Sequence, residues 1–119
     1  MAERGRSILL VDDDAGVRES LAAMLRQEGH EVITARDGEQ ALGLLRKGPL
    51  PDVILLDLMM PVLSGWEFLD VKAREPALRE VPVVLMTGYT EQGPPLRNVL
   101  ALLTKPLDMA QLRTMLQRL

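Results

Sequence analysis

The sequence contains no cysteine, which excludes a disulfide framework and any thiolate metal site. The fold must therefore be stabilised by its apolar core, as is typical of proteins in a reducing compartment, and we expect the protein to be cytoplasmic. Long apolar runs are also absent, and the segment from Met1 to Ser7 is polar. The sequence thus predicts neither a signal peptide nor an association with the membrane.

The sequence has no excess of positive charge: its 14 Lys and Arg are outnumbered by 17 Asp and Glu, which gives a formal net charge of −3. Proteins that hold nucleic acid by its phosphates carry clustered Lys and Arg, so we expect no direct binding of nucleic acid. Histidine occurs once, as His30, in a predicted turn at the end of the sheet opposite the polar residues described below. We interpret it as a solvated loop residue and not as a phosphocarrier.

The composition is otherwise that of a soluble globular protein, with 119 residues, 47% apolar and 26% charged. A chain of this length can bury a sizeable core, and no repeat, low-complexity tract or linker divides it. We therefore expect residues 1–119 to form a single domain.

Short apolar runs bounded by polar residues indicate five strands, most of them buried. The predicted strands are Ser7–Val11, Glu31–Ala35, Val53–Leu56, Val83–Met86 and Ala101–Thr104. Amphipathic helices are predicted between them and at the end of the chain, each opened by a capping residue. These caps are Asp14, Asp37, Ser64 and Asp108. Strands that alternate with helices predict an open α/β sandwich with a parallel sheet, which binds ligands at the carboxyl ends of its strands.

Three aspartates follow two of these strands. Asp12 and Asp13 come after the first strand and Asp57 after the third. If the two strands are neighbours, the three carboxylates converge and repel one another unless a cation lies between them. Oxygen ligands alone suit a hard ion such as Mg²⁺. A solvated turn with a helix cap is the alternative, and it is the one that we favour for Asp14.

Asp57 is the candidate nucleophile, since a carboxylate can attack phosphorus and form an aspartyl phosphate. Lys105 follows the last predicted strand and could contact the phosphoryl oxygens as a compact positive charge. The Thr87 hydroxyl, after the fourth strand, could donate a hydrogen bond to one of them. Thr-Gly and Lys-Pro are also common in turns, so either pair alone would indicate an ordinary turn without a functional role.

Four motifs occur in order at the predicted strand ends. They are Leu9-Leu10-Val11-Asp12-Asp13-Asp14, Leu55-Leu56-Asp57-Leu58-Met59-Met60-Pro61 with Ser64-Gly65, Met86-Thr87-Gly88 and Thr104-Lys105-Pro106. Together they resemble the receiver domain of two-component response regulators, and the likeness covers nearly the whole chain. The resemblance implies a flavodoxin-like (CheY-like) open sheet of five parallel strands in the order 2-1-3-4-5, with helices on both faces.

The same resemblance implies a role for each site residue. Its metal ligands for Mg²⁺ would be Asp12, Asp13, Asp57 and the backbone carbonyl of Met59. Asp57 would receive a phosphoryl group from a sensor histidine kinase or a phosphotransfer protein, with Thr87 and Lys105 as phosphoryl contacts. The family consists of signalling domains and not of enzymes, with at most self-catalysed phosphotransfer and autodephosphorylation. The downstream protein target is not written in the sequence.

Two features depart from the family. The aromatic residue that turns inward on phosphorylation normally lies three residues before the lysine, and Leu102 occupies that place here. The interval between Thr87 and Lys105 is shorter than the family's by about one helical turn, and it contains Gly93-Pro94-Pro95. We therefore expect the helix between the fourth and fifth strands to be short or irregular.

Two other classes of protein could use a similar set of residues. A haloacid dehalogenase-type phosphatase also combines Asp, Thr, Lys and Mg²⁺, but it needs a second acid two residues after the nucleophile, where this chain has Met59. A receiver-like docking module with vestigial phosphorylation is the second alternative. It is favoured by Leu102 and by the irregular helix, whereas the intact acidic pair, Asp57, Thr87 and Lys105 count against it.

Overall fold

The structure is a computed structural model. It describes residues 5–58, 64–87, 99–104 and 107–119, without the side chains of residues 87, 100 and 104. In chain order its elements are β1 (Ser7–Val11), α1 (Ala15–Gln27), β2 (Glu31–Ala35), α2 (Gly38–Lys47), β3 (Val53–Asp57), α3 (Gly65–Arg74), β4 (Val83–Thr87), β5 (Val99–Thr104) and α4 (Met109–Gln117). No helix within these segments has both the length and the apolar character needed to span a membrane.

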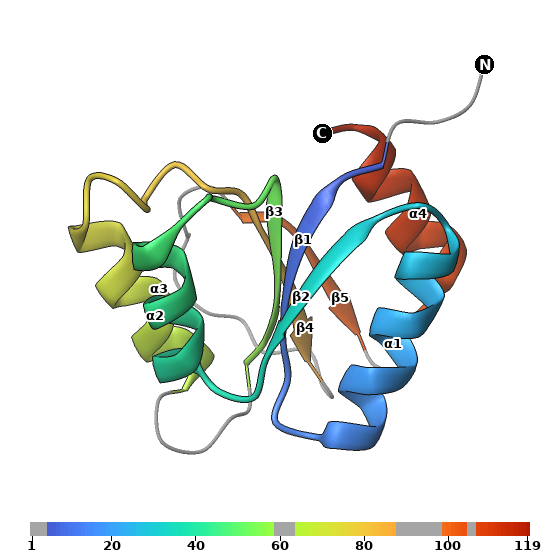
Figure 1. The fold of residues 1–119 in the computed structure, drawn as a ribbon, viewed down its shortest axis with the longest axis horizontal. Coiled ribbons are helices and arrows are strands. Elements are labelled where there is room, and N and C mark those ends of the chain that lie inside the picture. Colours follow the sequence, from blue (N-terminus) through green and yellow to red (C-terminus); the bar gives the residue numbers. More distant parts are fainter. Residues whose placement is uncertain (1–4, 59–63, 88–98, 105–106) are drawn as a thin grey trace.

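The five strands form one parallel sheet in the order β2-β1-β3-β4-β5, which confirms the predicted fold. Figure 1 shows α1 and α4 on one face of the sheet and α2 and α3 on the other. The chain passes from β1 to β2 on one side and returns to β3 on the other, so the strand order switches between β1 and β3. In open α/β sheets, ligands bind beside such a switch, at the carboxyl ends of the strands.

The burial of each strand follows from its place in the sheet. All five residues of the central strand β3 are buried, as expected for a parallel strand that is covered on both faces. The edge strand β2 is less buried, with Val32 and Ala35 buried on opposite faces of the sheet and Glu31 and Ile33 exposed. Both predicted segments, Glu31–Ala35 and Val53–Leu56, thus lie in strands.

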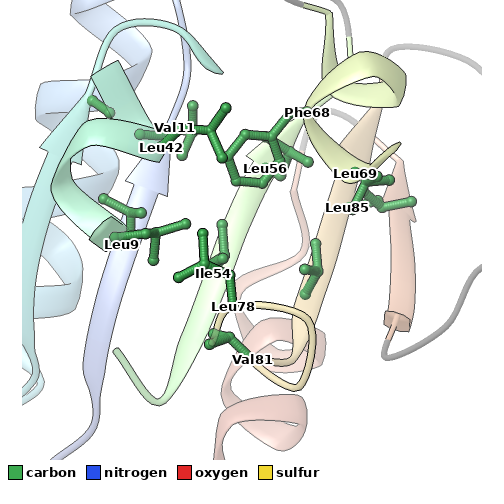
Figure 2. Packing of buried hydrophobic residues seen from close by; sticks show 14 of the residues in the cluster. Leu9, Val11, Leu42, Ile54, Leu56, Phe68, Leu69, Leu78, Val81 and Leu85 are labelled. Carbon is green, nitrogen blue, oxygen red and sulfur yellow. The ribbon is translucent and has the colours of Figure 1, made fainter. Parts of the chain in front are cut away.

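Successive residues of a strand point to opposite faces, so the sheet contributes to two separate apolar clusters. The α2/α3 cluster, drawn in Figure 2, includes Leu9, Val11, Ile54, Leu56, Phe68 and Leu85. The α1/α4 cluster on the other face includes Ile8, Leu10, Leu25, Val53, Leu55 and Leu112. Because neighbouring residues of β1 and β3 are held in different clusters, a shift of either strand by one residue would exchange the two sets.

The predicted capping residues open all four described helices. Ser64 forms a complete capping box, since its hydroxyl accepts from the Glu67 amide and the Glu67 carboxylate accepts from the Ser64 amide. At Asp37, with Gln40 three residues later, only half of such a box is formed. Asp37 accepts from the Gln40 amide, but the Gln40 side chain accepts from the backbone N–H of Arg36, one residue before the cap.

The last strand is longer than predicted and irregular. It begins at Val99, and its register against β4 shifts between Val83, which pairs with Val99, and Val84, which pairs with Ala101. One residue is therefore extra on β5, which is a β-bulge. The predicted helix between β4 and β5, with its Gly93-Pro94-Pro95 run, lies outside the described residues.

Lys72 is a buried lysine on α3, with a side chain 3% exposed. Its ammonium donates a hydrogen bond to the backbone carbonyl of Arg79 at 3.0 Å, which ties the helix to the segment that leads into β4. Burial lowers the pKa of Lys72 because it disfavours the charged form, and the nearby Glu80 carboxylate offsets part of this effect.

Candidate functional site

Three carboxylates meet at the carboxyl edge of the sheet. Asp57 is the last residue of β3 and is 4% exposed, and Asp12 directly follows β1 and is fully buried. Asp13 is exposed beside them. Each residue offers a carboxylate oxygen, and these three atoms lie within 4.8 Å of one another. The pairing of β1 with β3 explains the convergence, because it brings the ends of the two strands side by side.

Asp12 is fixed by its own backbone and side chain. Its N–H donates to the carbonyl of Ala35 at 3.1 Å, which extends the β1–β2 pairing by one residue. Its carboxylate accepts from the Asp14 N–H at 3.0 Å, and its carbonyl accepts from the Arg18 guanidinium at 2.9 Å. Asp14 itself accepts from the Val17 N–H at 3.1 Å and caps α1, as predicted. The turn between β1 and α1 therefore holds one acid inside and leaves the next one exposed.

Asp57 is fixed from the side of α3. The Leu58 N–H donates to the carbonyl of Met86, which extends the hydrogen bonding between β3 and β4 one residue beyond Asp57. The Gly65 N–H donates to the carbonyl of Leu58 at 3.1 Å. A Cβ at Gly65 would lie 2.7 Å from the Leu58 Cα and 3.0 Å from the Asp57 carbonyl oxygen. The first residue of α3 therefore has to be glycine for the helix to approach the strand so closely.

The donor set fits Mg²⁺. It consists of carboxylate oxygens only, which are the ligands that hard divalent cations prefer. Two of the carboxylates are buried, where like charges repel more strongly than in water and a cation relieves the repulsion. The exposed Asp13 leaves the site open towards solvent, in keeping with an ion that retains several waters.

The remaining predicted site residues are only partly described. Thr87 ends β4 opposite Thr104 of β5, so its backbone lies at the same edge of the sheet as Asp57. Its side chain, Lys105 and the carbonyl of Met59 lie outside the described residues. The structure therefore brings together Asp12, Asp13 and Asp57, and the roles of all six residues stay predictions.

Three further residues bear on the predictions. His30 accepts a hydrogen bond from the Arg6 N–H through Nδ1 at 2.9 Å, which ties the α1–β2 turn to the start of the chain. Leu102, in the place of the family's aromatic residue, is 41% exposed on β5. The contact of Arg18 with Asp12 was missed from the sequence, although an arginine in the first turns of a helix that follows an acidic loop is a signal that could have suggested it.

A comparison with protein families and with individual proteins agrees with this geometry. The model of the response regulator receiver domain matches residues 8–117. The phosphate regulon transcriptional regulatory protein PhoB of Escherichia coli is 38% identical over 94 residues, which are 79% of this chain and 41% of PhoB. The response regulator PleD of Caulobacter vibrioides is 42% identical over 106 residues, covering 85% of this chain and 23% of PleD. The chain thus spans less than half the length of these relatives.

Solved structures show the same fold. The chemotaxis protein CheY4 of Vibrio cholerae superposes with a TM-score of 0.85 at 31% identity, covering 97% of this chain and 98% of CheY4. The receiver domain of a signal transduction histidine kinase from Syntrophus aciditrophicus superposes with a TM-score of 0.82 at 26% identity, covering 96% of this chain and 89% of that domain. With its sheet order, its acidic edge and these relatives, the chain belongs to the response regulator receiver domains of two-component signalling systems.

Proposed function

We propose that Asp57 accepts a phosphoryl group from the phosphohistidine of a sensor histidine kinase or a phosphotransfer protein, in a reaction that depends on Mg²⁺. The phosphorylated domain would then change its protein contacts within a phosphorelay. The observation that carries the proposal is the approach of three carboxylates, from Asp12, Asp13 and Asp57, to within 4.8 Å at the carboxyl edge of the sheet. So close a group of acids, two of them buried, is costly unless the site works with a cation.

In this reaction a carboxylate oxygen of Asp57 attacks phosphorus, the P–N bond to the donor imidazole breaks, and the imidazole leaves with the bonding electrons. Bound Mg²⁺ would neutralise the negative charge of the transferring phosphoryl group and of the acceptor. Asp12 and Asp13 would hold the ion together with Asp57 and the carbonyl of Met59. The end of β3 fixes the backbone of Asp57, so little further ordering of the acceptor is needed before attack.

Thr87 and Lys105 would stabilise the phosphoryl oxygens, the first through its hydroxyl and the second through its ammonium. For Thr87 the support is the position of its backbone at the end of β4, at the same sheet edge as Asp57. For Lys105 the support is the motif alone. Residues 1–119 would form one receiver domain that works as a signalling phosphoacceptor in the cytoplasm, with at most self-catalysed phosphotransfer and autodephosphorylation.

The second candidate function is a receiver-like docking module in which phosphorylation has become vestigial. Leu102 favours it, because an exposed leucine on β5 has no ring or hydroxyl to turn inward when Asp57 is modified. The two candidates make different predictions about chemistry. A phosphoacceptor requires Asp57 and a metal, whereas a docking module binds its partner without either.

The test is the intact mass of the protein after incubation with Mg²⁺ and acetyl phosphate, beside an EDTA control and the Asp57→Asn variant. The proposal predicts the gain of one phosphoryl group that requires both the metal and Asp57. If Mg²⁺ binds, as shown separately by calorimetry, and no phosphoryl group is gained, phosphoacceptance is refuted and the docking module is favoured.

A further inference from the structure

We propose that Arg18 is a positioning residue for the acidic site, holding the turn between β1 and α1 so that Asp12 and Asp13 face Asp57. This inference rests on the proposed function, because it assigns a role in the metal site. Arg18 touches neither of the two carboxylates of that turn in the contacts described above. It acts instead through the backbone of Asp12, to which its guanidinium donates at 2.9 Å.

The contact joins a helix to the loop that the helix follows. Arg18 is fixed in the first turn of α1, where its backbone N–H donates to the carbonyl of Asp14 at 2.8 Å. Its side chain, half-buried, folds back past the helix start to the carbonyl of Asp12. The first residue of the acidic pair is therefore anchored to a rigid element that lies beyond the turn.

The Asp12 carbonyl accepts from Arg18 at a position where the loss of a hydrogen bond is costly. Asp12 is fully buried, so water cannot easily replace a lost hydrogen bond to its backbone. Its N–H and its carboxylate are held by Ala35 and Asp14, which fix the start of the turn. The guanidinium fixes the peptide that leads into Asp13 and thereby the direction in which the exposed carboxylate points.

Arg18 also carries a permanent positive charge, and the two effects of removing it on Mg²⁺ affinity have opposite signs. If the residue acted by charge alone, a neutral substitution would bring more net negative charge to the site and strengthen Mg²⁺ binding. If it acts by positioning, the substitution loosens the turn and weakens Mg²⁺ binding. The sign of the change therefore separates positioning from electrostatics.

The chain offers a matched control on the same helix. Arg26, at the opposite end of α1, donates from its guanidinium to the backbone carbonyl of Val32 at 2.7 Å. It makes the same kind of contact with a strand segment remote from the acidic edge. Arg26→Met therefore reproduces the general cost of losing such a contact without touching the turn that carries Asp12 and Asp13.

The experiment measures Mg²⁺ affinity by titration calorimetry, without any phosphodonor, for the unaltered protein, Arg18→Met, Arg18→Lys and Arg26→Met. We expect Arg18→Met to weaken binding on the order of tenfold, a typical effect for a residue that orients a metal ligand. Arg18→Lys, which keeps a donor and the charge, should recover part of the loss, and Arg26→Met should bind as the unaltered protein does. Equal or tighter binding by Arg18→Met overturns the inference.

A second readout needs no metal. In EDTA the amide of Asp14, which donates to the Asp12 carboxylate, should exchange its hydrogen faster in Arg18→Met than in the unaltered protein or in Arg26→Met. Unchanged exchange in Arg18→Met would overturn the positioning role even if its Mg²⁺ affinity fell. If Arg18→Met is not folded, Arg18→Gln takes its place under the same criteria. Failure of the unaltered protein to bind Mg²⁺ would instead refute the metal site, and this inference with it.

Discussion

Asp12 and Asp57 lie side by side because Val11 of β1 pairs with Leu56 of β3, so that each aspartate is the next residue on its strand. Their approach is a property of the sheet order β2-β1-β3-β4-β5, in which β1 and β3 are neighbours and β2 lies on the other side of β1. The sequence distance between the two acids is therefore irrelevant to their chemistry. What matters is that two strands end at one edge and that each ends in a carboxylate.

Removal of one carboxylate should raise the stability of the metal-free protein and weaken its binding of Mg²⁺. Asp13→Asn relieves repulsion among the three carboxylates, so we expect it to melt a few degrees higher than the unaltered protein in EDTA. Mg²⁺ at about 100 times its Kd should add about 2.7 kcal/mol to the unfolding free energy of the unaltered protein and much less to that of the variant. Glu19→Gln, an exposed change on α1, is the control and should alter neither value. Equal stabilisation of all three proteins by Mg²⁺ would place the metal elsewhere.

Two glycine-to-alanine changes should alter the free energy of unfolding in opposite directions. Gly65→Ala places a Cβ 2.7 Å from the Leu58 Cα, so α3 has to move away from β3, at a cost of about 1–3 kcal/mol. Gly43→Ala, on α2 with no atom within 4 Å of the new Cβ, should stabilise the protein by up to about 1 kcal/mol. Urea denaturation of both variants measures the difference. Similar effects of the two changes would mean that the close approach at Gly65 carries no constraint.

The buried lysine predicts a dependence of stability on pH. The pKa of Lys72 in the folded protein is below the ordinary value of 10.5, so between these two values the unfolded chain binds more protons. The free-energy cost of burying the charged Lys72 ammonium is fully present below its pKa in the folded protein. This cost is relieved as the pH rises towards 10.5. Between about pH 8 and about pH 10, the unfolding free energy of the unaltered protein should increase relative to that of Lys72→Met. A constant difference across this range would contradict the assigned shift.

Leu102 tests whether β5 influences the acceptor. Its side chain is 41% exposed, and its partner across the ladder is Leu85, two pairs before the end of the strands. Leu102→Tyr should therefore leave the unfolding free energy within about 0.5 kcal/mol of the original, as for most surface changes. It should also leave the initial rate of phosphorylation by acetyl phosphate unchanged within about twofold. A tenfold change of rate would show that this position is coupled to Asp57.

The fold could be predicted from the sequence because its strands are short and bounded. Val53–Leu56 is apolar throughout and ends at an aspartate, which is what a strand covered on both faces requires. The start of β5 was missed for a related reason. The run Val99–Thr104 is apolar almost to its end, so nothing in it marks which residues alternate and where a bulge interrupts the register.

The features of the acidic site that depend on strand ends could be predicted from the sequence. Those that depend on the packing of helices against strands could not. Asp12, Asp13 and Asp57 follow their strands directly, and parallel strands end at one edge. The contact of Arg18 with the Asp12 carbonyl and the clash that excludes a side chain at Gly65 depend on where a helix lies against a strand. A local pattern can suggest a donor such as Arg18 near an acidic loop, but it carries no such distance, so only the structure gives the two contacts.

The central claim is that Asp57 is the phosphoacceptor, and locating the phosphoryl group tests it most directly. Borohydride reduces an aspartyl phosphate to homoserine, which stays in the chain and can be found by peptide mass spectrometry. After incubation with Mg²⁺ and acetyl phosphate, the account predicts homoserine at position 57 and, in an EDTA control, none. Homoserine at another aspartate, or none at all in a protein that binds Mg²⁺, would contradict it.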